Sequence, residues 1–309
     1  ESSGRKTMPI RGGNLALYTS REKTFSGRSL DFEQARFVIL GFPYDRTSTY
    51  RRGSALAPTA IREASVNIET FSLRSNVDVE DIAICDVGDL DVVDDLAETL
   101  RRLEASVRDV QGAGKIPVLI GGEHTLTYGA VRGLGGDVAV VDFDAHLDLR
   151  DEYLGSRLSH TTHMRRLAEE IGPERIVEVG TRAISKSELE YARDVGVYFC
   201  STLEIRRHGA EKVSALVAQR LSKFRKRYIT IDMDVLDPAY APGVGNPEGD
   251  GLEIGTLIDI LTKVAADGVA GLDLVEVCPG CDTGVTAAQA VKVLFEALAA
   301  AERRGEYGG

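Results

Sequence analysis

Short apolar runs alternate with helical segments along most of this 309-residue chain. Eight runs have the length and β-branched content of buried strands, and they cover residues 37–42, 82–86, 116–120, 138–143, 175–179, 195–200, 227–231 and 269–277. Segments with apolar residues at helical spacing cover residues 58–73, 93–113, 125–134, 159–171, 186–194, 203–222, 253–266 and 284–303. Single strands separated by helices are typical of βαβ units. The pattern therefore predicts an α/β fold with about eight parallel strands.

The strand count fits both a closed eightfold barrel and an open doubly wound sheet, and both place the active site at the carboxyl ends of the strands. No sequence repeat or Pro/Ser-rich linker divides the chain. We therefore expect a single domain over residues 1–309. Within it, residues 1–36 form an N-terminal extension with little regular structure, and residues 304–309 form a loose tail.

The charge balance limits the class of partner. The chain carries 48 acidic and 37 basic residues, for a formal net charge of −11, which argues against nucleic acid or an anionic membrane. It mildly favours a cationic small molecule, although a solubilising acidic surface would give the same number. No apolar run approaches the roughly 20 residues of a membrane span. No secretory signal is visible near Glu1, so the cytoplasm is the expected location.

The four cysteines fall into two groups. Cys85 and Cys200 lie near the ends of apolar runs and are expected to be buried thiols. Cys278 and Cys281 form a CPGC unit, which fits a turn shaped by its proline and glycine, a redox pair or a structural disulfide. No second CxxC or CxxH completes a zinc site.

Residue types that bind metals follow three of the expected strands. Asp144, His146 and Asp148 follow the run at 138–143 with two-residue spacing, which sends alternate side chains to one side of an extended chain. His124 follows the glycine pair after the run at 116–120. Asp232 and Asp234 end the run at 227–231.

Alone, each of these residues could be a turn, capping or solvated loop residue. Together they offer two imidazoles and four carboxylates at one edge of a sheet. Six such ligands fit two hard or borderline cations that share bridging carboxylates and lower the pKa of a bound water.

The motifs GGEH, DFDAHLDL and TIDMDVLDP, in this order and spacing, resemble the manganese-binding motifs of the ureohydrolase family, which includes arginase and agmatinase. TYRRGSALAPTAIREAS, LDPAYAPGVGNPEGDGL and GLDLVEVCPGCD resemble other family segments, so the similarity runs from about residue 37 to about residue 300. The resemblance implies a three-layer, open, doubly wound sheet with helices on both faces. It also implies homotrimers or homohexamers.

The resemblance further implies a ligand set for two Mn²⁺ per chain. One manganese would be bound by His124, Asp144, Asp148 and Asp232, and the other by His146, Asp144, Asp232 and Asp234. Glu276 would bind the substrate guanidinium. Asp148 would also accept the proton of the attacking, metal-bridging hydroxide. Glu123 stands where many relatives have Asp, and we expect this difference to have little effect.

The resemblance places a proton shuttle in SHTTHMRR. Register with Ser159 matches His160 to the family's histidine, which would contact the substrate and protonate the leaving amine. His163 lies three residues further on and faces the same way if the helix starts here. It is therefore the alternative shuttle, or else a surface or supporting histidine.

The residues after the central motif are expected to select the substrate. Asp151 and Glu152 would favour a cationic tail, with Asp151 as a substrate-binding residue. This favours agmatine, hydrolysed to urea and putrescine, or N1-aminopropylagmatine. Pairing of Arg150 with a carboxylate would instead favour arginine or guanidinobutyrate. More distant alternatives are a one-zinc deacetylase, which would need adjacent histidines, and a non-catalytic polyamine-binding relative.

Overall fold

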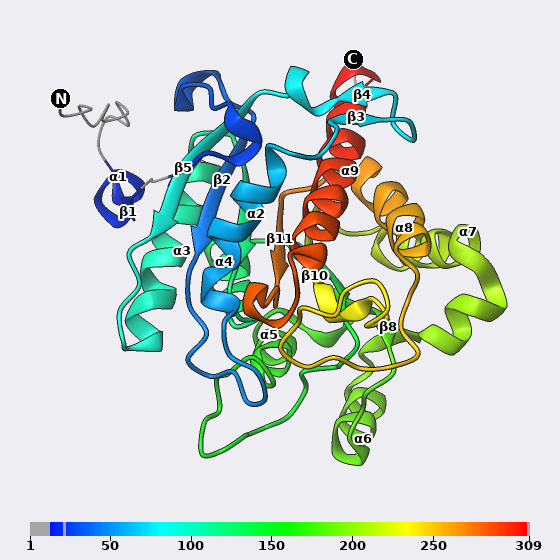
Figure 1. The fold of residues 1–309 in the computed structure, drawn as a ribbon. Helices are drawn as coiled ribbons and strands as arrows, with labels where there is room; N and C mark the ends of the chain where they lie inside the picture. Colours follow the sequence, from blue (N-terminus) through cyan, green and yellow to red (C-terminus); the bar gives the residue numbers. More distant parts are fainter. Residues whose placement is uncertain (1–12, 21–22, 308–309) are drawn as a thin grey trace.

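One nine-stranded sheet forms the centre of the molecule (Figure 1). The computed structural model describes residues 13–20 and 23–307. The strand order is β1-β5-β2-β6-β11-β10-β7-β8-β9, and each neighbouring pair is parallel except β1 with β5. The strands are β1 Thr19–Ser20, β2 Phe37–Phe42, β5 Ile84–Leu90, β6 Ile116–Gly121, β7 Val138–Phe143, β8 Ile176–Thr181, β9 Tyr198–Ser201, β10 Lys226–Asp232 and β11 Gly271–Val275. The eight expected parallel strands are confirmed, and the sheet is open.

Helices cover both faces of the sheet, which confirms the three-layer architecture. They are α1 Asn14–Tyr18, α2 Ala57–Ser65, α3 Leu96–Gly112, α4 Leu126–Leu134, α5 His163–Ile171, α6 Lys186–Val195, α7 Thr202–Leu221, α8 Ile254–Ala266 and α9 Val285–Tyr307. Short 3-10 helices are η1 Phe25–Gly27, η2 Phe32–Gln34, η3 Ser54–Leu56, η4 Val79–Asp81, η5 Pro173–Arg175, η6 Met233–Val235 and η7 Pro279–Cys281. Among the described residues, no helix combines the length and apolarity needed to span a membrane.

Two apolar clusters pack between the sheet and the helices, one on each face of the sheet. Phe37 and Ile39 of β2 pack with α2, α7, α8 and α9 on one face, whereas Val38 and Leu40 pack with α1, α3, α4 and α5 on the other. This alternation follows from the two-residue period of a strand. Because both faces of a parallel sheet are covered, its strands read as continuous apolar runs.

The expected helix at 58–73 is wrong at its end. α2 ends at Ser65, and Phe71 pairs with Asp78 in the two-stranded hairpin of β3 (Phe71–Ser72) and β4 (Val77–Asp78). The residues between, VNIET, are weak helix formers because most of them are β-branched or bond to their own backbone.

Both expected chain ends also differ from the structure. The described part of the N-terminal extension contains α1, β1, η1 and η2, and its Phe25 side chain is fully buried. Residues 1–12 and 21–22 of that expectation lie outside the described residues. At the other end α9 continues to Tyr307, and residues 308–309 are likewise outside.

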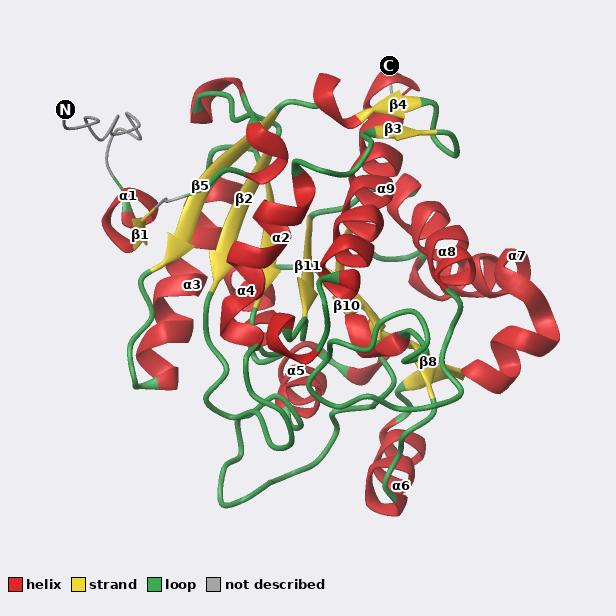
Figure 2. Cartoon of the chain, viewed as in Figure 1, coloured by secondary structure: helices red, strands yellow, loops and turns green. Residues whose placement is uncertain are grey.

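The strand order decides where the motifs meet. β6, β11, β10 and β7 are consecutive in the centre of the sheet although they are far apart in the sequence. All four are parallel, so their carboxyl ends share one edge. Figure 2 shows long loops gathered at that edge. The fold thus brings the three predicted metal-binding motifs together with Glu276, which follows β11.

Candidate active site

A tight turn after β6 places His124 at the sheet edge. A Cβ on Gly122 would collide with the Tyr44 carbonyl oxygen, so only glycine lets the chain pass this close to the segment after β2. The Gly122 N–H donates to the Phe42 carbonyl, and the next residue, Glu123, donates its N–H to Tyr44. His124 follows directly and is buried before α4 begins.

The His124 imidazole lies among carboxylates. Its Nδ1 is 3.1 Å from Asp144 Oδ2, 3.4 Å from Asp232 Oδ2 and 3.6 Å from Asp148 Oδ2. This nitrogen is buried and lacks a hydrogen-bond partner, as does Asp144 Oδ2. A buried nitrogen facing three carboxylate oxygens fits a shared cation.

Hydrogen bonding on the other side of the ring selects the tautomer. His124 Nε2 is 2.8 Å from Thr230 Oγ1, and that hydroxyl donates to Asp273 Oδ1 at 2.6 Å. Thr230 therefore accepts from Nε2–H, which leaves the Nδ1 lone pair directed at the carboxylates. Partners of this kind orient metal-binding histidines.

A second donor set lies beside the first. His146 Nδ1 is 3.2 Å from Asp144 Oδ1 and 3.2 Å from Asp234 Oδ2. Asp144 belongs to both sets, since its other oxygen faces His124. Asp232, also predicted as a ligand, accepts the Asp234 N–H at 2.8 Å and faces His124. All six predicted metal ligands are thus brought together, with Asp144 between the two histidines.

The electrostatics of the six residues fit divalent cations. Burial, then the charge of Asp144, raises the pKa of Asp148 well above its ordinary value. The pKa of Asp232 is also raised well above its ordinary value, first by burial and then by the charges of Asp234 and Asp144. Around Asp148 and Asp232, the carboxylates therefore crowd more negative charge together than the neighbouring imidazoles balance. Oxygen and imidazole donors with this charge are suited to hard or borderline metals such as manganese.

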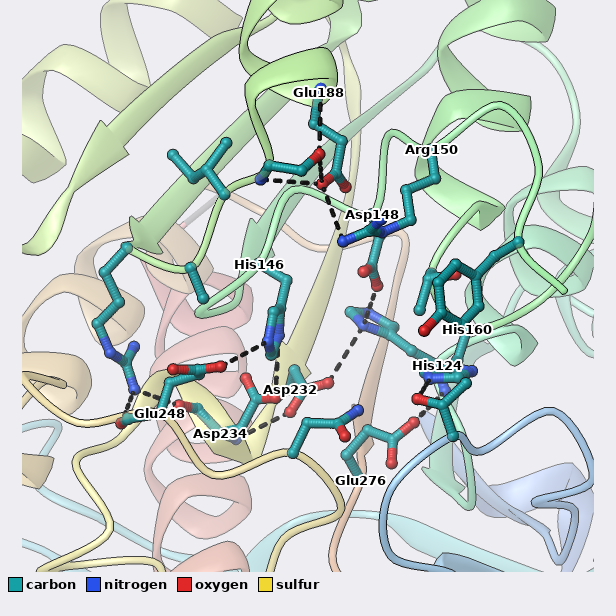
Figure 3. Close-up of a pocket in the computed structure, with 18 residues that line it drawn as sticks. His124, His146, Asp148, Arg150, His160, Glu188, Asp232, Asp234, Glu248 and Glu276 are labelled. Atoms are coloured by element: carbon teal, nitrogen blue, oxygen red, sulfur yellow. Dashed lines mark hydrogen bonds and ion pairs between the residues drawn. The ribbon is translucent and has the colours of Figure 1, made fainter.

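The cluster opens into a cavity of about 550 Å³. Figure 3 shows the labelled imidazoles and carboxylates directed into it. Glu276, which follows β11, also lines this cavity and accepts the His124 backbone N–H at 2.9 Å. Burial, then Glu123, raises the pKa of Glu276 to about 8. Asp148 and Glu276 both have positive φ, at 48° and 63°, a strained conformation that often marks functional sites.

His160 lines the cavity, and His163 does not. α5 begins at His163, so the two histidines do not share a helix face as expected. His160 Nδ1 and Nε2 lie 3.2 Å from the hydroxyls of Thr47 and Thr49. Burial, then the neighbouring His146, lowers the pKa of His160 to about 4. His163 is fully buried, packs against His124 at a tilt of 40° with ring centroids 4.2 Å apart, and donates Nδ1–H to the His160 carbonyl.

Glu123 lies beside the cavity and supports His160 indirectly. It is fully buried and accepts hydrogen bonds from the Thr47 N–H, the Thr47 hydroxyl and the Thr125 hydroxyl. Because the Thr47 hydroxyl donates to Glu123, its oxygen is free to accept from the His160 N–H and from Nδ1–H. Glu123 therefore orients His160 through Thr47.

Asp151 is not brought into the cavity, contrary to expectation. Its side chain is half exposed and lies within 4 Å of the guanidinium groups of Arg157, Arg165 and Arg166. Those three cations, and not a substrate, satisfy the carboxylate. The loop after Leu149 turns outward, so that Arg150 and Tyr153 line the mouth of the cavity instead.

Other carboxylates take the expected place at the mouth. Glu188 and Glu248 line the cavity. The Arg150 guanidinium lies 3.7 Å from Glu188 and stacks on Tyr153. Arg182 also lines the cavity, but its guanidinium donates to backbone carbonyls at Gly180, Asp234, Val235, Leu236, Glu248 and Gly249.

Comparison with known proteins agrees with this geometry. The family model described as the arginase family matches residues 35–300. The chain belongs to the arginase family.

The agmatinase of Bacillus anthracis is 36% identical over 84% of this chain and 89% of its own length. The N(1)-aminopropylagmatine ureohydrolase of Thermococcus kodakarensis is 33% identical over 94% of this chain and 99% of its own. The crystal structure of the agmatine ureohydrolase of Thermoplasma volcanium superposes with a TM-score of 0.86 at 36% identity, covering 95% of this chain and 98% of that one.

Membership in the arginase family confirms the ureohydrolase resemblance and the fold class. The chain is a ureohydrolase-type hydrolase, and its relatives imply a small cationic substrate. Sequence reasoning missed the supporting residues Thr47, Thr49, Thr230 and Asp273, because threonines in loops and strands carry no distinct signal. Glu123 was noted beside His124, but its hydrogen bonds to Thr47 and Thr125 were not predicted.

Proposed function

We propose that this arginase-family enzyme is a manganese-dependent agmatinase that hydrolyses agmatine to urea and putrescine. The observation that carries the proposal is the sharing of Asp144 by two donor sets, each with one histidine, on one side of a cavity that also contains Glu276. Water and the protonated guanidine give urea and a protonated amine, so atoms and charge balance.

The six clustered side chains would hold two Mn²⁺. His124, Asp144, Asp148 and Asp232 would bind one, and His146, Asp144, Asp232 and Asp234 the other. Bound metals of this kind lower the pKa of water and polarise the carbon under attack. The buried Nδ1 of His124 and Oδ2 of Asp144, both without a hydrogen-bond partner, support this assignment.

Three residues of the chain would bind the substrate and move protons. Glu276 would bind the guanidinium by charge-assisted hydrogen bonds, because its carboxylate reaches the cavity while staying fixed by the His124 N–H. Asp148 would accept the proton lost by the attacking water. His160 would contact the substrate and pass a proton to the leaving amine from its place on the cavity wall.

The mouth of the cavity supports a cationic tail. Glu188 and Glu248 line it, whereas the donors of Arg182 are used by backbone carbonyls. Arg150 is the cation that remains there, and it faces Glu188. Agmatine, with an ammonium at its far end, fits this balance better than arginine or guanidinobutyrate. N1-aminopropylagmatine is a second candidate, favoured by the relative from Thermococcus kodakarensis.

Urea release tests the proposal. The manganese-loaded protein should release urea from agmatine faster than from arginine, guanidinobutyrate or N1-aminopropylagmatine. Absence of urea release from all four compounds would contradict the proposal. A preference for arginine would contradict only the choice of agmatine as the substrate. Metal analysis should give two manganese per chain, whereas one zinc would favour the deacetylase alternative. Light scattering should give the mass of a trimer or hexamer.

Glu276→Gln separates substrate binding from metal binding. Glutamine keeps the acceptor for the His124 N–H but loses the charge that pairs with guanidinium. We expect kcat/KM to fall by roughly 10²–10³, the cost of losing one partner of a buried charged hydrogen bond. Manganese content should stay at the parent value. Unchanged kcat/KM would remove Glu276 from the proposed mechanism.

A further inference from the structure

The CPGC segment places two thiols in contact beside the cavity. Cys278 is buried, and Cys281 is partly exposed. Their Sγ atoms are 2.9 Å apart, and the 3-10 turn η7 brings the Cys281 N–H onto the Cys278 carbonyl at 2.9 Å. A turn that already holds two thiols together needs little rearrangement to close a bond between them.

We propose that Cys278 and Cys281 are a redox-active dithiol, and that its conversion to a disulfide weakens substrate binding at Glu276. The disulfide itself is independent of the proposed agmatinase activity, whereas its effect on catalysis rests on that activity. The oxidant is a low-molecular-weight disulfide, the class of compound that exchanges with protein thiols.

The exchange proceeds in two balanced steps. Burial, then the neighbouring Cys281 thiol, raises the pKa of Cys278 to about 12, so the more exposed Cys281 meets the external disulfide first. The Cys281 thiolate attacks one sulfur of the oxidant, forms a mixed disulfide and releases one thiol. Cys278 then loses its proton to water and attacks Cys281 Sγ, which releases the second thiol. One external disulfide is reduced while the protein loses two hydrogens.

Contacts of Cys278 connect this bond to the active site. The Cys278 thiol donates to the Arg52 carbonyl at 3.1 Å, and its backbone N–H donates to the Gly243 carbonyl at 2.7 Å. A disulfide removes the thiol hydrogen and therefore the bond to Arg52. Cys278 also packs against Gly53 so closely that a Cβ there would lie 2.9 Å from Sγ.

Both contacted segments reach the cavity. The segment before Arg52 carries Thr49, which bonds to His160, and the segment after Gly243 carries Asn246, which lines the cavity. Glu276 is two residues from Cys278 and has positive φ, so its position depends on the backbone that follows it. Small displacements of a substrate-binding group have large effects on rate. Oxidation should therefore act mainly on substrate binding.

The first test measures the bond without any activity assay. The manganese-loaded enzyme is incubated with oxidised glutathione, alkylated and analysed by peptide mass spectrometry. We expect Cys278 and Cys281 to be joined, with a loss of two hydrogens and no retained glutathione. Cys281→Ser should not form this link, and Cys200→Ala, which changes a buried thiol elsewhere, should behave as the parent. A glutathione adduct that persists on Cys281 of the parent would overturn the proposal.

The second test measures the consequence. With agmatine, the oxidised enzyme should show a KM raised by about tenfold or more, a smaller change in kcat and recovery with dithiothreitol. Cys281→Ser should keep the reduced KM under the same treatment. An unchanged KM in enzyme whose Cys278 and Cys281 are fully joined would contradict the proposal that the disulfide weakens substrate binding. If the reduced enzyme releases no urea, the proposed function is contradicted, and so is the proposed effect of the disulfide on catalysis. The mass spectrum still shows whether the disulfide forms.

Discussion

His124 donates Nε2–H to Thr230 Oγ1 at 2.8 Å, which turns its Nδ1 lone pair toward three carboxylates. The hydroxyl can accept because its own hydrogen goes to Asp273, at 2.6 Å. One threonine on β10 therefore fixes both the orientation and the tautomer of His124, a proposed metal ligand in the turn after β6. The proposed metal centre depends on residues that do not contact the metals.

Thr230→Val tests this dependence. Valine keeps the shape of threonine in the strand but cannot accept the His124 N–H. We expect manganese affinity to fall by about 10- to 100-fold, as is usual for partners of metal ligands, measured by calorimetry. Thr262→Val, on the surface of α8, is the control. Parent-like affinity in Thr230→Val would show that the tautomer does not need this hydroxyl.

Thr47→Val tests the orientation of His160. Valine removes the hydroxyl that joins His160 to Glu123. If His160 protonates the leaving amine, kcat should fall by about 10²-fold, within the range of general acid catalysis, with manganese content unchanged. Thr161→Val changes a cavity-lining threonine that bonds to Ser159 and not to the His160 ring, and should keep most of the activity. Equal kcat in both variants would argue against the relay.

Glu178→Gln tests a buried acid pair. Asp142 and Glu178 are fully buried neighbours across β7 and β8. Burial raises the pKa of Asp142 from 3.8 to about 8, and burial with the charge of Asp142 raises the pKa of Glu178. Each raised pKa means that the folded state holds a proton that the unfolded state loses. The stability that these bound protons contribute is therefore fully present below about pH 4 and is lost as the pH rises toward 8.

The amide introduced by Glu178→Gln does not titrate. The melting temperature of the manganese-loaded parent should therefore fall more steeply between pH 5 and 8 than that of the variant. Glu296→Gln, at a buried carboxylate paired with Lys292, should keep the slope of the parent. Parallel slopes for the parent and Glu178→Gln would show that Glu178 does not contribute to this pH dependence.

Arg62→Met tests the attachment of α2 to the sheet. The Arg62 guanidinium is 3% exposed and donates to both oxygens of Asp86, at 2.8 and 3.0 Å. Removing it takes the Arg62 guanidinium away from a fully buried carboxylate, which should lower the free energy of unfolding by about 3–5 kcal/mol. Urea denaturation measures the change. Arg101→Met, at an exposed pair on α3, should leave stability nearly unchanged.

Periodicity predicted the strands well and the helix ends less well. Each central strand is buried on both faces, so its apolar run is continuous and easy to recognise. The end of α2 and the short elements before β2 escaped prediction because they depend on distant partners. Phe71 pairs with Asp78, and Phe25 is held through its N–H to Asp86.

Residue type and spacing at strand ends singled out the six side chains that the structure brings together. Two-residue intervals at strand ends direct side chains to one side, and the scarcity of histidine made the pattern distinctive. The same reasoning failed for Asp151, because local sequence does not show that Arg157 of the following loop and Arg165 and Arg166 of α5 take up its charge. Nor could it choose between His160 and His163, since that depends on where α5 begins.

The sequence by itself determined the α/β class, the identity of the six clustered donors and the family resemblance, because strand period and residue chemistry are local properties. Only the tertiary structure decided that β6, β11, β10 and β7 are neighbours. It also decided that Thr230 orients His124, that Thr47 orients His160, and that Cys278 contacts the segment that carries Thr49. Those relationships join residues tens to hundreds of positions apart. They arise from packing both faces of one sheet, which no local pattern records.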